Sequence, residues 1–305
     1  MSTSDRIQKT AARIRRRVLD YTLRNNGGYL SQACSSAEIF ATMYLEIMNL
    51  GASVAPMIPM PFPGVPGANN PQAFTGGGYN GPRCQDLDRF FISPVHYALV
   101  LYSTLIEVGR MAPEGLEMFN KDGSTVELIG AEHSPGHELT AGSLAQCLSQ
   151  AGGISLARKI RGESGRNWVF MSDGEFEEGQ TWEAFAALAY HRVDNIGVYV
   201  DVNGQQCDGP VTSVMNIEPL ATRLDAFGAR VFDVDGHNPK VLADPASMVP
   251  DGRPLVVLAR TDPCCGIALL KKRAPKLHYV RFKSEEEQKQ YEAALLEMKR
   301  TEGEG

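Results

Sequence analysis

Two polar residues that could bind a divalent cation follow two predicted strands. The apolar runs at 167–171 (NWVFM) and 196–200 (IGVYV) are typical of buried strands, and a helical pattern over 179–190 connects them. Asp173 comes just after the first run, and Asn203 comes just after the second. Because the carboxyl ends of parallel strands meet at one edge of an open α/β sheet, where ligands bind, we expect these side chains to reach one site.

The chemistry of this pair suits a metal-bridged diphosphate. A carboxylate and an amide oxygen are hard ligands for Mg²⁺ or Ca²⁺, and such ions keep open positions for phosphate oxygens and water. Gly174 and Gly204 follow the two residues directly and let the backbone turn close to a ligand. D-G and N-G are also ordinary turn dipeptides, so the pair taken alone fits a surface turn equally well.

The elements around this pair predict an α/β fold. In the second half of the chain, apolar runs alternate with helical segments, at 167–171, 196–200, 229–234 and 254–259. Runs of this kind predict a parallel sheet flanked by helices on both faces. Helices are expected over the following segments: 5–23, 36–47, 94–108, 141–159, 179–190, 219–227 and 284–299.

The first two helices carry specific expectations. Ser36 is the predicted N-cap of the second helix. The first helix contains a cluster of arginines: Arg13, Arg15, Arg16 and Arg17. We expect this cluster to form a solvated face rather than a binding site for an acidic ligand.

The composition of the 305-residue chain excludes several classes of protein. Its 43% hydrophobic content suffices for one large domain or two small ones. With 30 basic and 36 acidic side chains, a net charge of −6 and a pI near 5.6, it lacks the basic surplus of a nucleic-acid binder. A charged N-terminus and the lack of an apolar run of about 20 residues argue against a secretory signal and membrane insertion. The six cysteines have no zinc-like spacing, so a reducing cytoplasm is expected.

Four motifs occur in order along nearly the whole chain: DLDRFFIS (86–93), HSPGHELTAG (133–142), MSDGEFEEGQTWEA with its closing DVNGQQCDG (171–209), and DVDGHN (233–238). They resemble the D-R-D-R-F-x-L-S, T-P-G-H-P-E, G-D-G to N and D-I-D-G-H-D segments of the transketolase family. The resemblance implies the thiamine diphosphate-binding fold and transfer of a two-carbon unit with thiamine diphosphate. No G-x-G-x-x-G lies between a strand and a helix, which disfavours a dinucleotide-binding enzyme.

The resemblance also implies a set of site residues. Asp173 and Asn203 would hold the metal, with the main-chain oxygen of Gln205 as a third protein ligand. The residues implied in cofactor binding are His137, Gly142, Leu144, Ser172, Gly174, Glu175 and Asn203. The histidines implied in polarising donor oxygens and moving protons are His96, His137 and His278. His237 is expected to be structural, and Glu178 is expected to join a carboxylate relay, to be solvated or to lie at an interface.

The sequence departs from the family pattern in three places. Tyr29 stands at the position of the family's substrate-binding histidine, and a phenol with a pKa of about 10 is a poor proton shuttle at neutral pH. Ala145 and Cys147 replace two glycines of the family's G-P-L-G-Q-G, which we expect to alter the approach of the backbone to the cofactor. The Pro- and Gly-rich segment 51–83 replaces a shorter connection, and we expect it to pack at a subunit interface or over the active-site mouth.

A partner subunit is a further implication of the resemblance. Full transketolases continue into a pyrimidine-binding domain, which carries the glutamate that activates the cofactor, and a C-terminal domain. We therefore expect residues 1–283 to form a diphosphate- and metal-binding domain, followed by a helix and tail at 284–305. Catalysis on a ketose donor and an aldose acceptor, phosphorylated or not, is expected only with a pyrimidine-domain partner, in an α2β2 assembly.

Two other functions stay open. A two-subunit thiamine diphosphate enzyme could pass its two-carbon unit to a lipoyl or acyl carrier, a possibility that Tyr29 raises. A non-catalytic paralogue could bind the cofactor or a partner as a scaffold, although the retained Asp173, Asn203, His96 and His137 argue against it.

Overall fold

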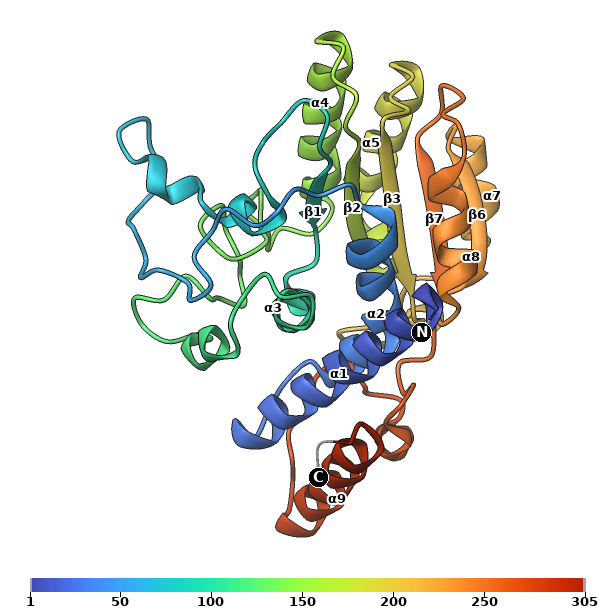
Figure 1. The fold of residues 1–305 in the computed structure, drawn as a ribbon. Coiled ribbons are helices and arrows are strands. Elements are labelled where there is room, and N and C mark those ends of the chain that lie inside the picture. The colour runs from blue at the N-terminus through green and yellow to red at the C-terminus, as the bar shows by residue number, and fades with distance from the viewer. Residues whose placement is uncertain (1, 304–305) are drawn as a thin grey trace.

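The centre of the molecule is a parallel sheet of five strands (Figure 1). The structure is a computed structural model, which describes residues 2–303. The strands lie in the order β1, β2, β3, β7, β6. Their bounds are Arg89–Ile92 (β1), Asn167–Ser172 (β2), Ile196–Val202 (β3), Arg230–Asp235 (β6) and Leu255–Arg260 (β7). Every pairing in the sheet is parallel, so the carboxyl ends of all its strands lie at one edge. A separate antiparallel hairpin joins β4 (Gln205–Gln206) and β5 (Gly209–Pro210).

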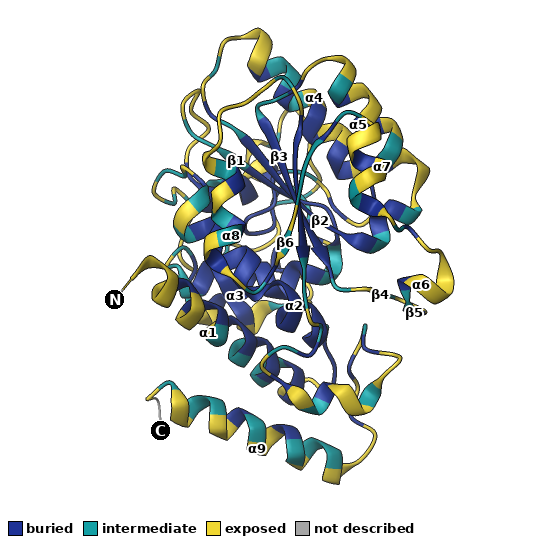
Figure 2. Cartoon of the chain, turned by 90° about the vertical axis from the view of Figure 1, so that its right-hand side faces the viewer, coloured by how far each residue is buried: buried dark blue, intermediate teal, exposed yellow. Residues whose placement is uncertain are grey.

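Helices cover both faces of the sheet, which confirms the predicted α/β class (Figure 2). One face carries α1 (Thr3–Arg24), α2 (Leu30–Thr42), α3 (Ala98–Glu107) and α8 (Pro239–Ala243). The other face carries α4 (Gln146–Ile160), α5 (Gly179–Tyr190) and α7 (Leu220–Ala226). Along β2, Trp168 and Phe170 belong to the first core and Val169 and Met171 to the second, because successive side chains of a strand point to opposite faces.

The remaining helical elements lie outside these two layers or are single turns. Helix α9 (Glu285–Thr301) packs on α1, and its Tyr291 and Leu295 join the first core. A short helix, α6 (Val211–Val214), follows β5, and a π-helical turn (Met43–Ile47) follows α2. The 3-10 turns are Pro71–Phe74, Gly76–Asn80, Val95–Tyr97, Pro113–Met118, Asp173–Glu177, Asp244–Ser247 and Ala268–Arg273. Within residues 2–303, no helix combines the length and the apolar character that crossing a membrane requires.

The structure corrects two predicted helix starts and adds a strand. Helix α2 begins at Leu30, and Ser36 lies inside it, where its hydroxyl donates to the carbonyl of Gln32 at 2.6 Å. Every residue of α2 is buried, so the helix lacks the amphipathic alternation from which its start could be predicted. The helix expected from residue 141 begins only after Ala145, whose φ of 68° is left-handed. Strand β1 was not predicted, because its four residues carry little periodic signal.

Segment 51–83 lies to one side of the sheet, beside residues 111–138 (Figure 1). Hydrogen bonds hold it there: the N–H of Phe62 donates to the carbonyl of Gly123 at 2.8 Å, and Thr125 Oγ1 donates to the carbonyl of Met60 at 2.9 Å. Several of its apolar side chains are exposed: Val54, Met57, Ile58, Met60, Phe62, Val65 and Phe74. The segment is therefore anchored by hydrogen bonds and still exposes apolar side chains.

The expected solvated face was wrong for Arg15, Arg16 and Arg17. Arg16 and Arg17 are partly buried in ion pairs with Glu302 and Glu107, and only Arg13 of the cluster is exposed. Arg15 is only 5% exposed, because α2 covers that side of α1. Its guanidinium donates to the carbonyl of Cys34 at 3.0 Å and forms an ion pair with Glu38, which also contacts His237 Nδ1 at 3.0 Å. Burial opposes ionisation of Glu38, but the hydrogen bonds from His237 and Arg15 lower the pKa of its carboxyl overall. Arg15 therefore ties α1 to α2 in the interior.

We predict that Arg15→Met lowers the free energy of unfolding by about 3 kcal/mol, because Glu38 would keep a buried charge without its guanidinium partner. Urea unfolding measures this change. Arg13→Met is the matched control, since Arg13 is exposed on the same helix, and its expected effect is below about 0.5 kcal/mol. Equal losses in the two variants would contradict a stabilising role for the buried pair.

Candidate functional site

The carboxyl edge of the sheet brings together polar residues from four strands. Ser93 follows β1, Asp173 follows β2, Asn203 follows β3, and Thr261 follows β7. Parallel strands place these ends side by side, as the sequence predicts for Asp173 and Asn203. The edge is therefore built from side chains that are far apart in the chain.

The loops of Asp173 and Asn203 meet directly. Asp173 Oδ2 accepts from the N–H of Gly204 at 2.7 Å, and its Oδ1 accepts from the N–H of Gly174 at 2.9 Å. Asn203 Oδ1 accepts from the N–H of Gln205 at 2.8 Å. Gly204 has a φ of 69°, a left-handed conformation that favours glycine and lets its N–H face the carboxylate. The residues predicted to hold the metal thus share one small region.

The oxygens in this region fit a divalent cation. Asp173 is 1% exposed and forms no ion pair with any lysine, arginine or histidine among residues 2–303. Burial and the neighbouring Asp201 raise the pKa of its carboxyl to about 8. Gln205 adds a buried side-chain oxygen without a partner. A bound cation would supply the missing positive charge and accept these hard oxygen ligands.

Asp201, which sequence reasoning missed, fixes the orientation of Asn203. Its Oδ2 accepts from Ser35 Oγ at 2.5 Å, Tyr97 OH at 2.8 Å and Asn203 Nδ2 at 3.0 Å, and its Oδ1 accepts from Thr261 Oγ1 at 2.5 Å. Because the amide nitrogen of Asn203 faces Asp201, its oxygen is left on the side of Gln205. Burial raises the pKa of Asp201, against the effect of these hydrogen bonds. The only sequence signal was an acidic residue at the end of a buried strand.

The carboxylate of Glu175 is occupied by protein donors. It accepts from the Ser93 hydroxyl, from the N–H of Ala145 at 3.0 Å and from the N–H of Ser172 at 2.9 Å. Burial raises the pKa of this carboxyl. Glu175, predicted to bind cofactor, therefore ties together the ends of β1 and β2 and the loop before α4.

That loop, residues 142–145, keeps an unusual backbone. Gly142 has a φ of 110°, and a Cβ there would lie 2.9 Å from Ile129 Cγ2. Ala145 is left-handed, a conformation that alanine adopts only at a cost. Alanine at the position of a family glycine thus retains a glycine-like conformation, held by the contact with Glu175. Leu144 is partly exposed between them.

A cluster of rings combines two of the predicted histidines with Tyr29. The ring centroids of His96 and His278 are 4.7 Å apart, and Tyr29 lies 5.9 Å from His96 and 5.5 Å from His278. Tyr97, next to His96, reaches Asp201 and Asn203 through its hydroxyl. Residues from three distant parts of the chain thus meet near the metal-binding loops.

Burial sets the protonation of this cluster. It lowers the pKa of His96 to about 3, with help from His278, and it also lowers the pKa of His278. Burial raises the pKa of Tyr29, so the phenol stays protonated. The amide nitrogen of Gln32 lies 3.2 Å from His278 Nδ1 and can only donate, which leaves the proton of neutral His278 on Nε2. The cluster therefore offers neutral donors and acceptors.

The third predicted histidine, His137, lies in a different environment. Its Nδ1 is 3.3 Å from the carbonyl of Pro135, its ring centroid is 5.9 Å from that of Tyr102, and none of the described ring contacts joins it to His96 or His278. Its Nε2 is buried without a hydrogen-bond partner among residues 2–303, which is costly unless a ligand supplies one. Burial lowers the pKa of its imidazole to about 4.

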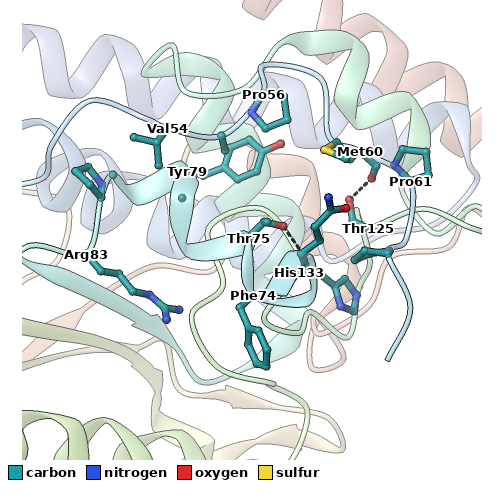
Figure 3. Close-up of a pocket in the computed structure, with 16 residues that line it drawn as sticks. Val54, Pro56, Met60, Pro61, Phe74, Thr75, Tyr79, Arg83, Thr125 and His133 are labelled. Carbon is teal, nitrogen blue, oxygen red and sulfur yellow. Dashed lines mark hydrogen bonds between the residues drawn. The ribbon is translucent and has the colours of Figure 1, made fainter. Parts of the chain in front are cut away.

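A separate cavity of about 290 Å³ lies between segment 51–83 and the loop that carries His133 (Figure 3). Its walls include Phe74, Tyr79 and Arg83. None of the predicted site residues lines it.

Half-buried His96 and buried His137 predict a loss of stability in acid. Because the pKa of His96 (about 3) and of His137 (about 4) is lowered in the folded state, the unfolded chain binds more protons below pH 6.5, and stability falls as the pH falls. Between pH 7 and pH 5 each should account for about 2 kcal/mol of this loss. His96→Gln and His137→Gln should each remove about that amount from the pH dependence of unfolding, and the double variant should remove both. An unchanged pH dependence would contradict the neutral assignment.

Comparison with known proteins identifies the family. Residues 77–286 match the family described as transketolase, thiamine diphosphate binding domain. A transketolase family protein of Sinorhizobium fredii is 32% identical over 92% of this chain and 92% of its own length. One subunit of the apulose-4-phosphate transketolase of Actinobacillus succinogenes is 28% identical over 97% of this chain and 96% of its own length.

Solved transketolases share this fold within longer chains. The transketolase of Campylobacter jejuni superposes with a TM-score of 0.68 at 18% identity, covering 98% of this chain and 47% of that enzyme. The chain therefore spans about half the length of that enzyme. The family match over most of the chain, together with the sheet edge described above, confirms the resemblance, and the chain belongs to the transketolase family through its thiamine diphosphate-binding domain.

Proposed function

We propose that this chain is the cofactor-binding subunit of a two-subunit transketolase, which moves a two-carbon ketol unit from a ketose donor, phosphorylated or not, to an aldose acceptor. The observation that carries the proposal is the hydrogen bond between the Asp173 carboxylate and the Gly204 N–H. It joins the loop after β2 to the loop after β3, at the two ends of the segment that resembles the family's G-D-G to N. The full-length similarity to a protein named as one subunit of a transketolase supports the division of the enzyme into two chains.

The residues proposed to hold the cofactor are those that the resemblance to the family implies. Mg²⁺ or Ca²⁺ would bind the side-chain oxygens of Asp173 and Asn203 and the main-chain oxygen of Gln205. The diphosphate and thiazolium would lie along the following residues: His137, Gly142, Leu144, Ser172, Gly174 and Glu175. When bound, thiamine diphosphate supplies the carbanion chemistry that takes up the two-carbon unit.

The chain's own histidines would orient the substrate and handle protons. Neutral His278 offers its Nε2–H to a substrate oxygen, because Gln32 occupies Nδ1. His96, also neutral, lies against His278 and offers a ring nitrogen for a hydrogen bond to the substrate. Tyr29 can donate a hydrogen bond but cannot shuttle protons at neutral pH, so donor recognition at this position would rely on the phenol hydroxyl.

The partner would supply the pyrimidine-binding half of the site. In this proposal residues 1–283 form the diphosphate- and metal-binding domain, 284–305 form the terminal helix and tail, and two copies of each chain assemble as α2β2. Exposed Glu178, at the start of α5, would lie at the contact between subunits. The exposed apolar side chains of segment 51–83 would face the partner or the mouth of the site.

We predict that Asp173→Ala raises the Kd for Mg²⁺ and thiamine diphosphate at least 100-fold, because it removes the only negatively charged ligand of the proposed metal site. Calorimetry on the protein purified with its partner measures this change. Asp225→Ala is the matched control, since Asp225 is an exposed aspartate on α7. Unchanged binding in Asp173→Ala, or equal losses in the two variants, would refute the assigned metal site.

We also predict that the isolated chain, given Mg²⁺, thiamine diphosphate and a ketose, shows no ketol transfer until the partner subunit is added. A coupled assay with a phosphorylated aldose as acceptor measures the reaction. Full turnover by the chain alone would contradict the two-subunit proposal. Transfer to a lipoyl or acyl carrier in place of the aldose would instead identify a carrier-dependent enzyme.

A further inference from the structure

Segment 51–83 touches the loop that carries His137 through its glycine turn, Gly76–Asn80. We propose that Gly76 and Asn80 are positioning residues, which set the backbone of residues 132–138 and thereby the place of the His137 imidazole. The effect on cofactor binding through His137 rests on the function proposed above. The contact between the turn and the loop does not depend on that function.

Gly76 holds the loop at two points. Its N–H donates to the carbonyl of Glu132 at 2.7 Å, and its carbonyl accepts from the N–H of Gly136 at 2.9 Å. Within the loop itself, the N–H of His137 donates to the carbonyl of Ser134 at 3.0 Å. The backbone just before His137 is therefore closed on itself and pinned to the turn.

Only glycine fits at this contact. A Cβ at position 76 would lie 2.2 Å from the carbonyl oxygen of Ser134, 2.6 Å from that of His137 and 2.8 Å from that of Glu132. All three are main-chain atoms, which cannot rotate away as a side chain can. A methyl group must therefore displace either the turn or the loop.

Asn80 adds a third anchor. It is 3% exposed, and its Nδ2 donates to the carbonyl of Gly136 at 3.1 Å. Its Oδ1 accepts from the hydroxyl of Tyr44 at 2.8 Å. This chain of hydrogen bonds connects the π-helical turn after α2 to the loop through the inserted segment.

The buried imidazole of His137 makes few hydrogen bonds. Its Nδ1 contact with Pro135 is long, at 3.3 Å, and its Nε2 has no partner. The ring packs against Gly130, where a Cβ would lie 2.2 Å from Nε2. Because the one hydrogen-bond contact of the ring is to Pro135 of the same loop, its position follows the backbone that Gly76 and Asn80 hold.

Free space adjoins both the turn and the loop. Thr75, Gly78 and Tyr79 line the cavity of about 290 Å³ that lies between this segment and His133 (Figure 3). Because the cavity borders both, a displaced turn or loop has space to move into. We therefore expect a bulkier residue at position 76 to give a folded protein in which the loop and the turn have separated.

The test compares Gly76→Ala with Gly78→Ala. The two glycines lie in the same turn, but a Cβ at Gly78 would make only ordinary contacts of 3.4 Å and longer. The first readout is the imidazole NMR signal of His137 at fixed pH, without cofactor, assigned by its loss in His137→Gln. The second is the Kd for Mg²⁺ and thiamine diphosphate of the protein purified with its partner.

We expect Gly76→Ala to move the His137 signal and to raise the Kd at least tenfold, while Gly78→Ala leaves both unchanged. An unmoved signal in folded Gly76→Ala would overturn the proposal. If the wild type binds no cofactor, the proposed function fails, but the NMR comparison still decides the contact.

If Gly76→Ala does not fold, Asn80→Ala replaces it, with Tyr44→Phe as its control. Asn80→Ala removes the anchor on Gly136 directly, whereas Tyr44→Phe removes only the support of Asn80. A His137 signal that moves in Asn80→Ala and moves less in Tyr44→Phe supports the proposal. Equal signals in Asn80→Ala and the wild type would overturn it.

Discussion

The carboxylate of Asp201 accepts hydrogen bonds from four side chains that arrive from separate parts of the fold. Ser35 comes from α2, Tyr97 from the turn after β1, Thr261 from the end of β7, and Asn203 from the loop after β3. A buried carboxylate left without these donors would be strongly unfavourable, so the four segments must converge for the chain to fold. The same convergence places Tyr97 beside His96 and turns the Asn203 amide. The architecture of the site thus follows from satisfying one buried group.

The charge of the site follows from the kind of donors that satisfy its carboxylates. Asp173, Glu175 and Asp201 are all buried, and among residues 2–303 their hydrogen bonds come from hydroxyl groups, backbone N–H groups and one amide. None of these donors carries a positive charge. The edge of the sheet therefore holds an excess of acidic groups, which a divalent cation would balance. The nearby imidazoles of His96 and His278 are kept neutral by burial and do not supply that charge.

Much of the fold could be predicted because its strands and helices carry strong periodic signals. Strands β2, β3 and β7 are continuous apolar runs, and the helix at 179–190 was predicted with its observed bounds. The misses have physical causes. Strand β1 is too short to show a period, and α2 is buried all round, so neither gives an amphipathic pattern. The burial of Arg15 could not be predicted, because its partner Glu38 lies on another helix and nothing local marks the pair.

The sequence by itself determined that Asp173 and Asn203 end neighbouring parallel strands, because strand order and direction follow from the alternation of strands and helices. It also determined the motif order that identifies the family. Only the tertiary structure decided which side chains complete the site. Asp201 gains its donors, Tyr29 meets His278, and Gly76 reaches the loop of His137 through contacts between residues far apart in the chain. Such contacts depend on burial and on hydrogen bonds between segments, and these have no local period that a sequence can display.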